Sequence, residues 1–174
     1  FNPSWFAAVM VGGPYVIPYF LQWGGFSLGQ VGLWTVLSAL SGLAFGPLWG
    51  RAADRLGHGR VLLLTGGVAA VMPLFWLWGR PGFPWPIWAS ALLDALAWSG
   101  LNPALTNLAL GKSPKEARNG YLALFWLALG LGGLLGSLLA GELAALHLGP
   151  TPYHLPILAS MGLRLLMLLG FRRL

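Results

Sequence analysis

Long apolar runs, separated by short clusters of glycine, proline and charged residues, dominate this chain. A helix that crosses the hydrocarbon core of a bilayer needs about 20 mostly apolar residues. Six runs reach that length, at residues 4–22, 28–49, 60–79, 84–110, 114–146 and 153–171. Strands of a membrane barrel are shorter, at about 9–11 residues, and alternate in polarity. The pattern therefore predicts an all-α integral membrane protein, with six transmembrane helices in a single domain over residues 1–174.

Composition supports a bilayer environment and argues against several other classes of protein. Hydrophobic residues make up 57% of the chain and charged residues 8%, whereas a soluble domain carries about 25% charged residues. The net charge of +6 comes from cations in short connectors rather than on one exposed face, so we expect no binding to nucleic acid. The chain has no cysteine and its histidines are not clustered, so we expect no metal site.

The positions of the cations predict the orientation of the helices. Eight of the ten lysines and arginines lie in two connectors and the C-terminal tail, at Arg51, Arg55, Arg60, Lys112, Lys115, Arg118, Arg172 and Arg173. The connectors on the opposite side hold only Arg80. Because cytoplasmic loops are enriched in lysine and arginine, both termini are expected to be cytoplasmic.

The fifth run carries a predicted helix start and a stripe of small residues. Ser113, Pro114 and Glu116 have the spacing of a capping box with proline at the first helical position. Small residues that would let a second helix approach closely follow at Gly132, Gly133, Gly136, Ser137 and Gly141. Two interpretations remain open for this stripe, namely tight helix packing and a face that lines a solute path.

A charged segment between the second and third runs resembles a known signature. Its residues Gly50, Ala53, Asp54, Arg55 and Gly57, followed by Arg60, are similar to the loop between the second and third helices of the major facilitator superfamily. That pattern reads glycine, any residue, leucine, a small residue, aspartate, arginine, any residue and glycine, then two basic residues. Here Ala52 replaces the leucine and His58-Gly59 replace the basic pair.

The resemblance implies a secondary transporter and not an enzyme. It implies half of a two-part bundle, and the degenerate signature, together with the start at Phe1, leads us to expect the C-terminal half of a longer protein. The implied partners are membrane lipid, an N-terminal half and a small solute, with no cofactor and a multi-pass location in a cell inner (plasma) membrane. Transport would proceed by alternating access and could be coupled to protons.

The resemblance also implies roles for the residues of the signature loop. Gly50 would allow a close crossing of two backbones, and the Asp54 carboxylate would face the positive N-terminal end of a helix in the opposite half. Arg55 and Arg60 would anchor the connector and form ion pairs that break as the halves rock.

Two charged residues lie inside predicted spans. Asp94 follows Pro84 by ten residues and Arg164 follows Tyr153 by eleven, so both lie about 15–17 Å from the same side of the membrane at 1.5 Å per residue. A carboxylate at such a depth costs about 2.5–3.5 kcal/mol. We consider two compensations: a structural ion pair with Arg164, and binding of a proton or a cationic solute at Asp94.

Further cavity-lining candidates follow from the resemblance, because the first, second, fourth and fifth helices line the central cavity in that family. They are Asn102, Thr106, Asn107, Tyr15 and Tyr19. Pro103 is expected to bend the fourth helix, and Pro14 and Pro18 to interrupt the first. Trp34 is expected at the outer interface.

Two alternatives to a transporter were weighed. One is a six-helix membrane protein that acts by assembling with partners or as a scaffold. The other, less favoured, is an intramembrane protease built on Ser99 and His154, whose predicted depths differ by several helical turns.

Overall fold

The computed structural model describes residues 2–114 and 117–171, and within these ranges the regular structure is helical. Apart from helices it holds one isolated bridge between Arg80 and Phe83 in a connecting turn. The elements are α1 (Asn2–Gly12), the 3-10 turn η1 (Gly13–Tyr15), α2 (Val16–Gln22), α3 (Leu28–Leu56), α4 (His58–Trp78), α5 (Trp85–Lys112), α6 (Arg118–Ala145) and α7 (His154–Phe171).

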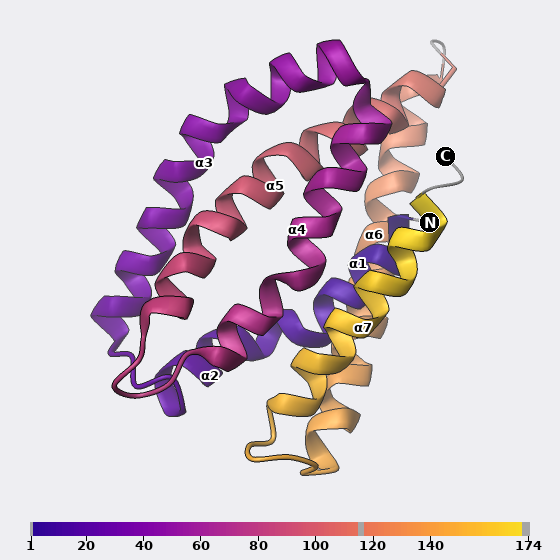
Figure 1. The fold of residues 1–174 in the computed structure, drawn as a ribbon. Coiled ribbons are helices and arrows are strands. Elements are labelled where there is room, and N and C mark those ends of the chain that lie inside the picture. The colour runs from indigo at the N-terminus through magenta and orange to yellow at the C-terminus, as the bar shows by residue number, and fades with distance from the viewer. Residues whose placement is uncertain (1, 115–116, 172–174) are drawn as a thin grey trace.

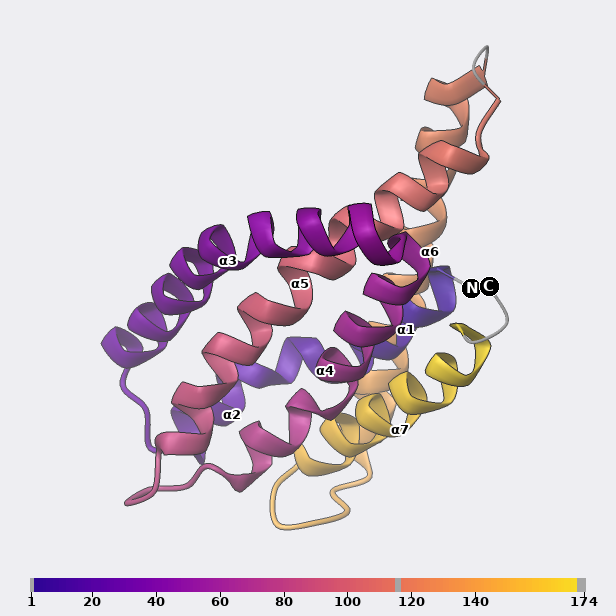
Figure 2. The same cartoon turned by 45° about the horizontal axis from the view of Figure 1, so that its top comes forward.

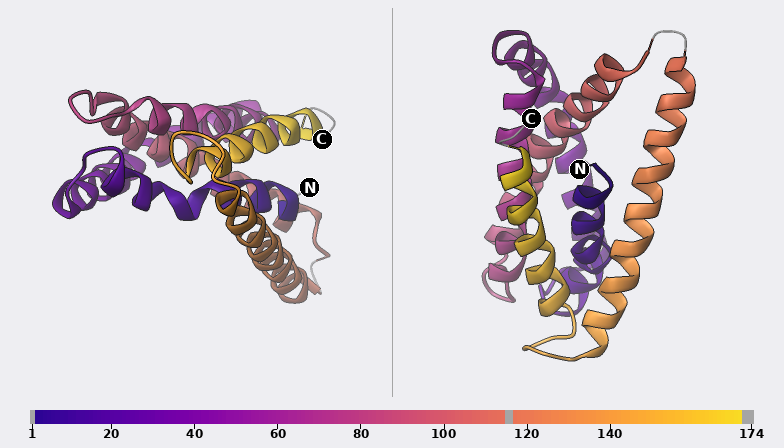
Figure 3. Two further views of the ribbon diagram at one scale, coloured as in Figure 1. Left: turned by 90° about the horizontal axis from the view of Figure 1, so that it is seen from below. Right: turned by 90° about the vertical axis from the view of Figure 1, so that its right-hand side faces the viewer.

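The lengths and composition of these helices agree with a membrane bundle. Four stretches are long and apolar enough to cross a bilayer, at Pro3–Gln22, Leu28–Leu56, His58–Trp78 and Arg118–Ala145. α5 has 28 residues and α7 has 18. The α3–α4 and α5–α6 connections lie toward one end with both described termini, and the other connections lie at the opposite end (Figures 1 and 3). The number of spans and their orientation in a membrane stay predictions.

Packing divides the helices into a core and two open edges. α4 packs against α5 and α7, α1 packs against α6 and α7, and α3 lies along α5. The views show α6 leaning away from α3, α4 and α5 (Figures 2 and 3). Along the 29 residues of α3 only Val31 and Trp34 are buried. α3 and α6 therefore present long apolar faces that no other described element covers.

The first span is broken where its prolines predict. α1 ends at Gly12, the 3-10 turn contains Pro14, and α2 contains Pro18. At this break α7 crosses very close to α1, because a Cβ placed on Gly12 would lie 2.8 Å from the Cβ of Ser160. Ser160 also donates a hydrogen bond from its hydroxyl to the carbonyl of Ala8 at 2.6 Å. The interruption therefore coincides with a tight contact between two helices.

Glycines of α6 allow the close approach of α1. A Cβ on Gly132 or Gly136 would overlap the backbone carbonyl of Pro3 or Ala7. This arrangement agrees with tight packing for the first part of the stripe. Gly141 lies beyond it, and a Cβ there would meet no atom of the described chain within 4 Å.

Two helix boundaries differ from expectation. α3 does not end at Trp49 but continues to Leu56, so most of the signature segment is helical and only Gly57, at φ +83°, separates it from α4. The predicted start of the fifth span is also wrong, because α6 begins at Arg118 and Ala117 gives it no side-chain cap. Ser113 instead donates to the carbonyl of Leu110 at the end of α5; Glu116 lies outside the described residues. A capping box is present elsewhere, at Ser27 and Gln30.

Candidate functional site

Asp94 lies on the side of α5 that faces α3. The hydroxyl of Ser38 donates to its Oδ2 at 2.7 Å, and the indole N–H of Trp98, one turn further along α5, also hydrogen-bonds the carboxylate. The side chain is only partly buried. Its charge is therefore stabilised by neutral donors from two helices while part of the carboxylate stays accessible.

Arg164 is almost completely buried on α7, with 1% of its surface exposed. Its Nη1 donates to the carbonyl of Ala69 at 2.7 Å and its Nη2 to that of Val9 at 3.3 Å. Pro73 has no N–H to give to the carbonyl four residues earlier, which is that of Ala69. Val9 belongs to the last turn of α1, where carbonyls lack intrahelical partners. The guanidinium therefore satisfies a carbonyl that Pro73 leaves unpaired inside α4 and another at the end of α1.

Asp94 and Arg164 line the same cavity of about 220 Å³. The rest of its wall comes from the broken first span, α3, α4 and α5, through Val9, Gly13, Val16, Ile17, Trp34, Met72, Trp76 and Trp98. In the described part of the chain no salt bridge joins Asp94 to Arg164, although their charges attract each other. The two residues thus lie beside one cavity, but the expected direct ion pair is not formed, because backbone carbonyls hold the guanidinium.

The other candidates on α5 divide between two surfaces. Asn102 and Thr106 line a small hollow of about 50 Å³ between α1, α5 and α6. The hydroxyl of Thr106 donates to the carbonyl of Asn102 at 3.0 Å. Asn107 lines a different cavity, beside the signature segment. Adjacent residues on a helix do not share a face, which explains why Asn107 separates from Thr106.

The tyrosines of the broken helix contact the start of α7 and are not part of the wall of the Asp94 cavity. The ring of Tyr15 packs on Tyr153 with centroids 5.5 Å apart, and the ring of Tyr19 meets the edge of His154 at 5.6 Å. Nδ1 of His154 also forms a hydrogen bond with the hydroxyl of Thr151 at 2.7 Å. Ser99, the partner considered for His154 in a protease, instead lines the cavity beside the signature segment.

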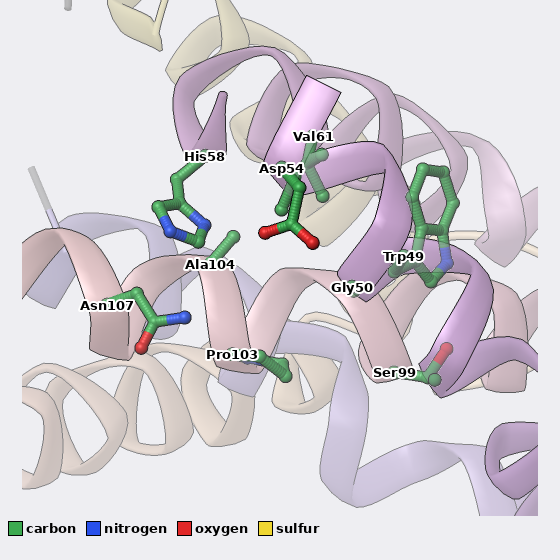
Figure 4. A pocket seen from close by; sticks show the side chains of 12 residues that line it. Trp49, Gly50, Asp54, His58, Val61, Ser99, Pro103, Ala104 and Asn107 are labelled. Atoms are coloured by element: carbon green, nitrogen blue, oxygen red, sulfur yellow. The ribbon is translucent and has the colours of Figure 1, made fainter. Parts of the chain in front are cut away.

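The signature residues form the wall of a second cavity, of about 190 Å³, between α3, α4 and α5. Figure 4 shows the Asp54 carboxylate and the His58 ring turned toward α5, with Asn107 near one end and Trp49 and Ser99 near the other. Among the described residues Asp54 has neither a hydrogen bond nor an ion pair, and Nδ1 of His58 is buried without a partner.

The close crossing expected at Gly50 is not made by any residue that the structure describes. A Cβ on Gly50 would meet no described atom within 4 Å, whereas one on Gly100 would lie 2.6 Å from the side chain of Thr65. Arg55 and Arg60 are exposed on either side of Gly57. No other described residue therefore covers the helix surface at Gly50 or the side chains of Arg55 and Arg60.

Sequence reasoning missed four residues of the Asp94 site: Ser38, Trp34, Trp76 and Trp98. Trp98 had a readable signal, because it follows Asp94 by four residues on a helix. Trp34, expected at the outer interface, is buried and donates from its indole to the carbonyl of Ile87 at 3.0 Å. The rotation of α3 against α5, which decides where Ser38 and Trp34 point, has no signal in the sequence of either helix.

Comparison with known proteins gives one family. The family model described as Major Facilitator Superfamily matches residues 4–173. No match was found among curated proteins.

Proposed function

Since this chain belongs to the Major Facilitator Superfamily, we propose that it is the C-terminal six-helix half of a secondary transporter that moves a small solute by alternating access. The two halves of such a protein rock around a site near the middle of the membrane. The observation that carries the proposal is the cavity that Asp94 and Arg164 both line beside a broken helix. We place the protein in a cell inner (plasma) membrane, with both termini cytoplasmic.

The N-terminal half is the proposed partner for the open edges of this unit. α3 and α6 expose many leucines, including Leu40, Leu43, Leu135 and Leu138. The open cavity at Asp54 lies at the end of α3. A helix N-terminus from the other half, placed there, would give the carboxylate the positive partner that the described part of this chain does not supply. Arg55 and Arg60 would then anchor the gate on the cytoplasmic side.

Asp94 is the proposed coupling residue, with Arg164 as its electrostatic counterpart. An intramembrane carboxylate that faces a cavity is costly and marks ion and proton paths. Protonation of Asp94 would leave the positive charge of Arg164 without a counter-charge in the cavity, so the proton and the solute would influence each other's binding. We propose Asn102, Thr106, Asn107, Tyr15 and Tyr19 as further groups near the solute path.

Flux measurements on the natural protein in liposomes test this proposal. A pH dye inside the vesicles reports proton movement while carboxylates, amines, sugars and amino acids are added outside in turn. We expect one of these solute classes to change the internal pH. The change should be lost in Asp94→Asn. It should persist in the control variant Glu142→Gln, whose carboxylate is exposed on α6. Solute flux that keeps its rate and pH dependence in Asp94→Asn would rule out the coupling role.

A further inference from the structure

Two residues that border the cavity beside Asp94 carry a hydrogen-bond donor that has no acceptor among the described residues. Nε of Arg164 and Nε1 of Trp76 are both buried and make no hydrogen bond. The two side chains are 1% and 3% exposed, and both line this cavity. A buried donor left without an acceptor destabilises the fold, and two of them beside one cavity call for an explanation. An oxygen-bearing ligand would supply the missing acceptors.

The unpaired polar groups beside the cavity favour an anionic ligand over a cationic one, because both are donors and a cation brings no acceptor. Arg164 and Asp94 are the charged residues of its described wall, and the wall from α1, α2, α3 and α4 is neutral. The guanidinium already lies over the face of Trp76, with Cζ 5.9 Å from the ring centroid. A second cation on that ring would meet the positive charge of Arg164 in a medium that screens it weakly.

Charge balance then links such an anion to a proton. With Asp94 ionised, the Asp94 and Arg164 charges cancel, and an entering carboxylate would add one uncompensated negative charge. With Asp94 protonated, the carboxylate and Arg164 balance each other. Net charge in a membrane interior is costly, so the anion binds best when Asp94 carries a proton.

The size and wall of the cavity limit the rest of the ligand. A volume of 220 Å³ corresponds to about seven water molecules at 30 Å³ each. Trp34, Trp76, Trp98 and Met72 supply aromatic and apolar surface. We propose, building on the proposed transport function, that this cavity binds a small monocarboxylate with an aromatic or apolar body, held by Arg164 Nε and Trp76 Nε1 together with a proton on Asp94.

Binding at both nitrogens requires a shift of the Trp76 side chain. Both donor nitrogens are shielded from water in this structure, so a carboxylate reaches them only if the indole shifts. Benzoate is a suitable probe because it joins a carboxylate to a flat ring. Benzamide keeps its shape without the charge, and benzylamine reverses the charge.

Equilibrium dialysis with the purified natural protein in detergent tests the proposal. At about pH 6 and about pH 8 benzoate is ionised, so a difference in its binding reports a protein group. We expect benzoate to bind more tightly at the lower pH and much more tightly than benzamide or benzylamine. Trp76→Phe keeps a ring but removes the donor, and should weaken benzoate binding about tenfold or more. Trp78→Phe, on the exposed side of the same helix, is the matched control and should bind as the wild type does.

Two further variants complete the test. Asp94→Asn should bind benzoate equally at both pH values, because its amide is neutral throughout. Arg164→Lys keeps the charge and loses Nε, so it should weaken binding even when the thermal unfolding of the variant shows that it is folded.

Tighter binding of benzylamine than of benzoate, or equal binding in Trp76→Phe and wild type, would overturn the carboxylate assignment. Flux of another solute class that depends on Asp94 would overturn it while leaving the transport proposal standing. Benzoate binding as described, without any solute flux in liposomes, would keep this site and refute the transport function.

Discussion

Replacing Arg164 by methionine together with Pro73 by alanine tests whether the guanidinium takes the place of the missing proline N–H. In the wild type, Nη1 donates to the Ala69 carbonyl at 2.7 Å and Nη2 to Val9 at 3.3 Å. A hydrogen bond from a charged group contributes about 1.5–3 kcal/mol. Arg164→Met loses these bonds, but it also removes the cost of burying a charge. The stability of the single variant therefore mixes two effects of opposite sign.

The double-mutant cycle separates these effects. Pro73→Ala restores an N–H that can reach the Ala69 carbonyl along the helix. In that background Arg164→Met leaves only the Val9 carbonyl without its partner. We therefore expect the arginine substitution to cost about 1–2 kcal/mol less there than in the wild type. The cost of burying the charge is common to both backgrounds and cancels.

Thermal unfolding of the four proteins in detergent measures the coupling. For a chain of this size each kcal/mol corresponds to about 2–4 °C in Tm, so the expected interaction is a shift of several degrees. Pro47→Ala is the control, because it restores an N–H toward Leu43 on the exposed α3, away from Arg164. Combined with Arg164→Met it should be additive within about 0.5 kcal/mol. If Pro73→Ala combined with Arg164→Met were also additive within about 0.5 kcal/mol, the guanidinium would not be replacing the missing proline N–H.

Other substitutions give simpler expectations. Gly136→Ala should lower the free energy of unfolding by about 1–3 kcal/mol through overpacking against Ala7. Gly141→Ala should leave it unchanged, because the added methyl group meets no described atom within 4 Å. Thermal unfolding of both variants measures the difference. Gly57→Ala should destabilise by about 1 kcal/mol, since its φ is +83°; equal Tm values for variant and wild type would contradict this. Asp54→Asn should slow solute flux in liposomes without changing benzoate binding in dialysis, and weaker binding would show that the two cavities are not independent.

Hydropathy predicts where helices lie but not how far each one extends. The apolar run of the second span ends at Trp49, yet α3 continues to Leu56 because Arg51 and Arg55 point away from the bundle, where a helix tolerates charge. Ser113 and Pro114 resemble a helix start, but α6 begins only at Arg118. A capping pattern shows that a start is chemically possible at a position, and tertiary packing decides whether it is used.

The proximity of Asp94 and Arg164 was predictable from the sequence, but the contacts that hold them were not. Counting along two helices places Asp94 and Arg164 at one level, and the structure puts both on one cavity. The acceptors of Arg164 are backbone carbonyls, which have no side-chain signature. The Ala69 carbonyl was nevertheless deducible, because it lies four residues before Pro73. The indole of Trp76 depends on how α4 is rotated against α7, and that rotation follows from the packing of the whole bundle.

The unbroken length of α3 has a mechanical consequence. Ser38, which holds the Asp94 carboxylate, and Asp54, at the signature cavity, lie on this one helix. Sixteen residues separate them, which is about 24 Å at 1.5 Å per residue. A tilt of the helix at its Asp54 end would therefore also displace the hydroxyl that holds Asp94.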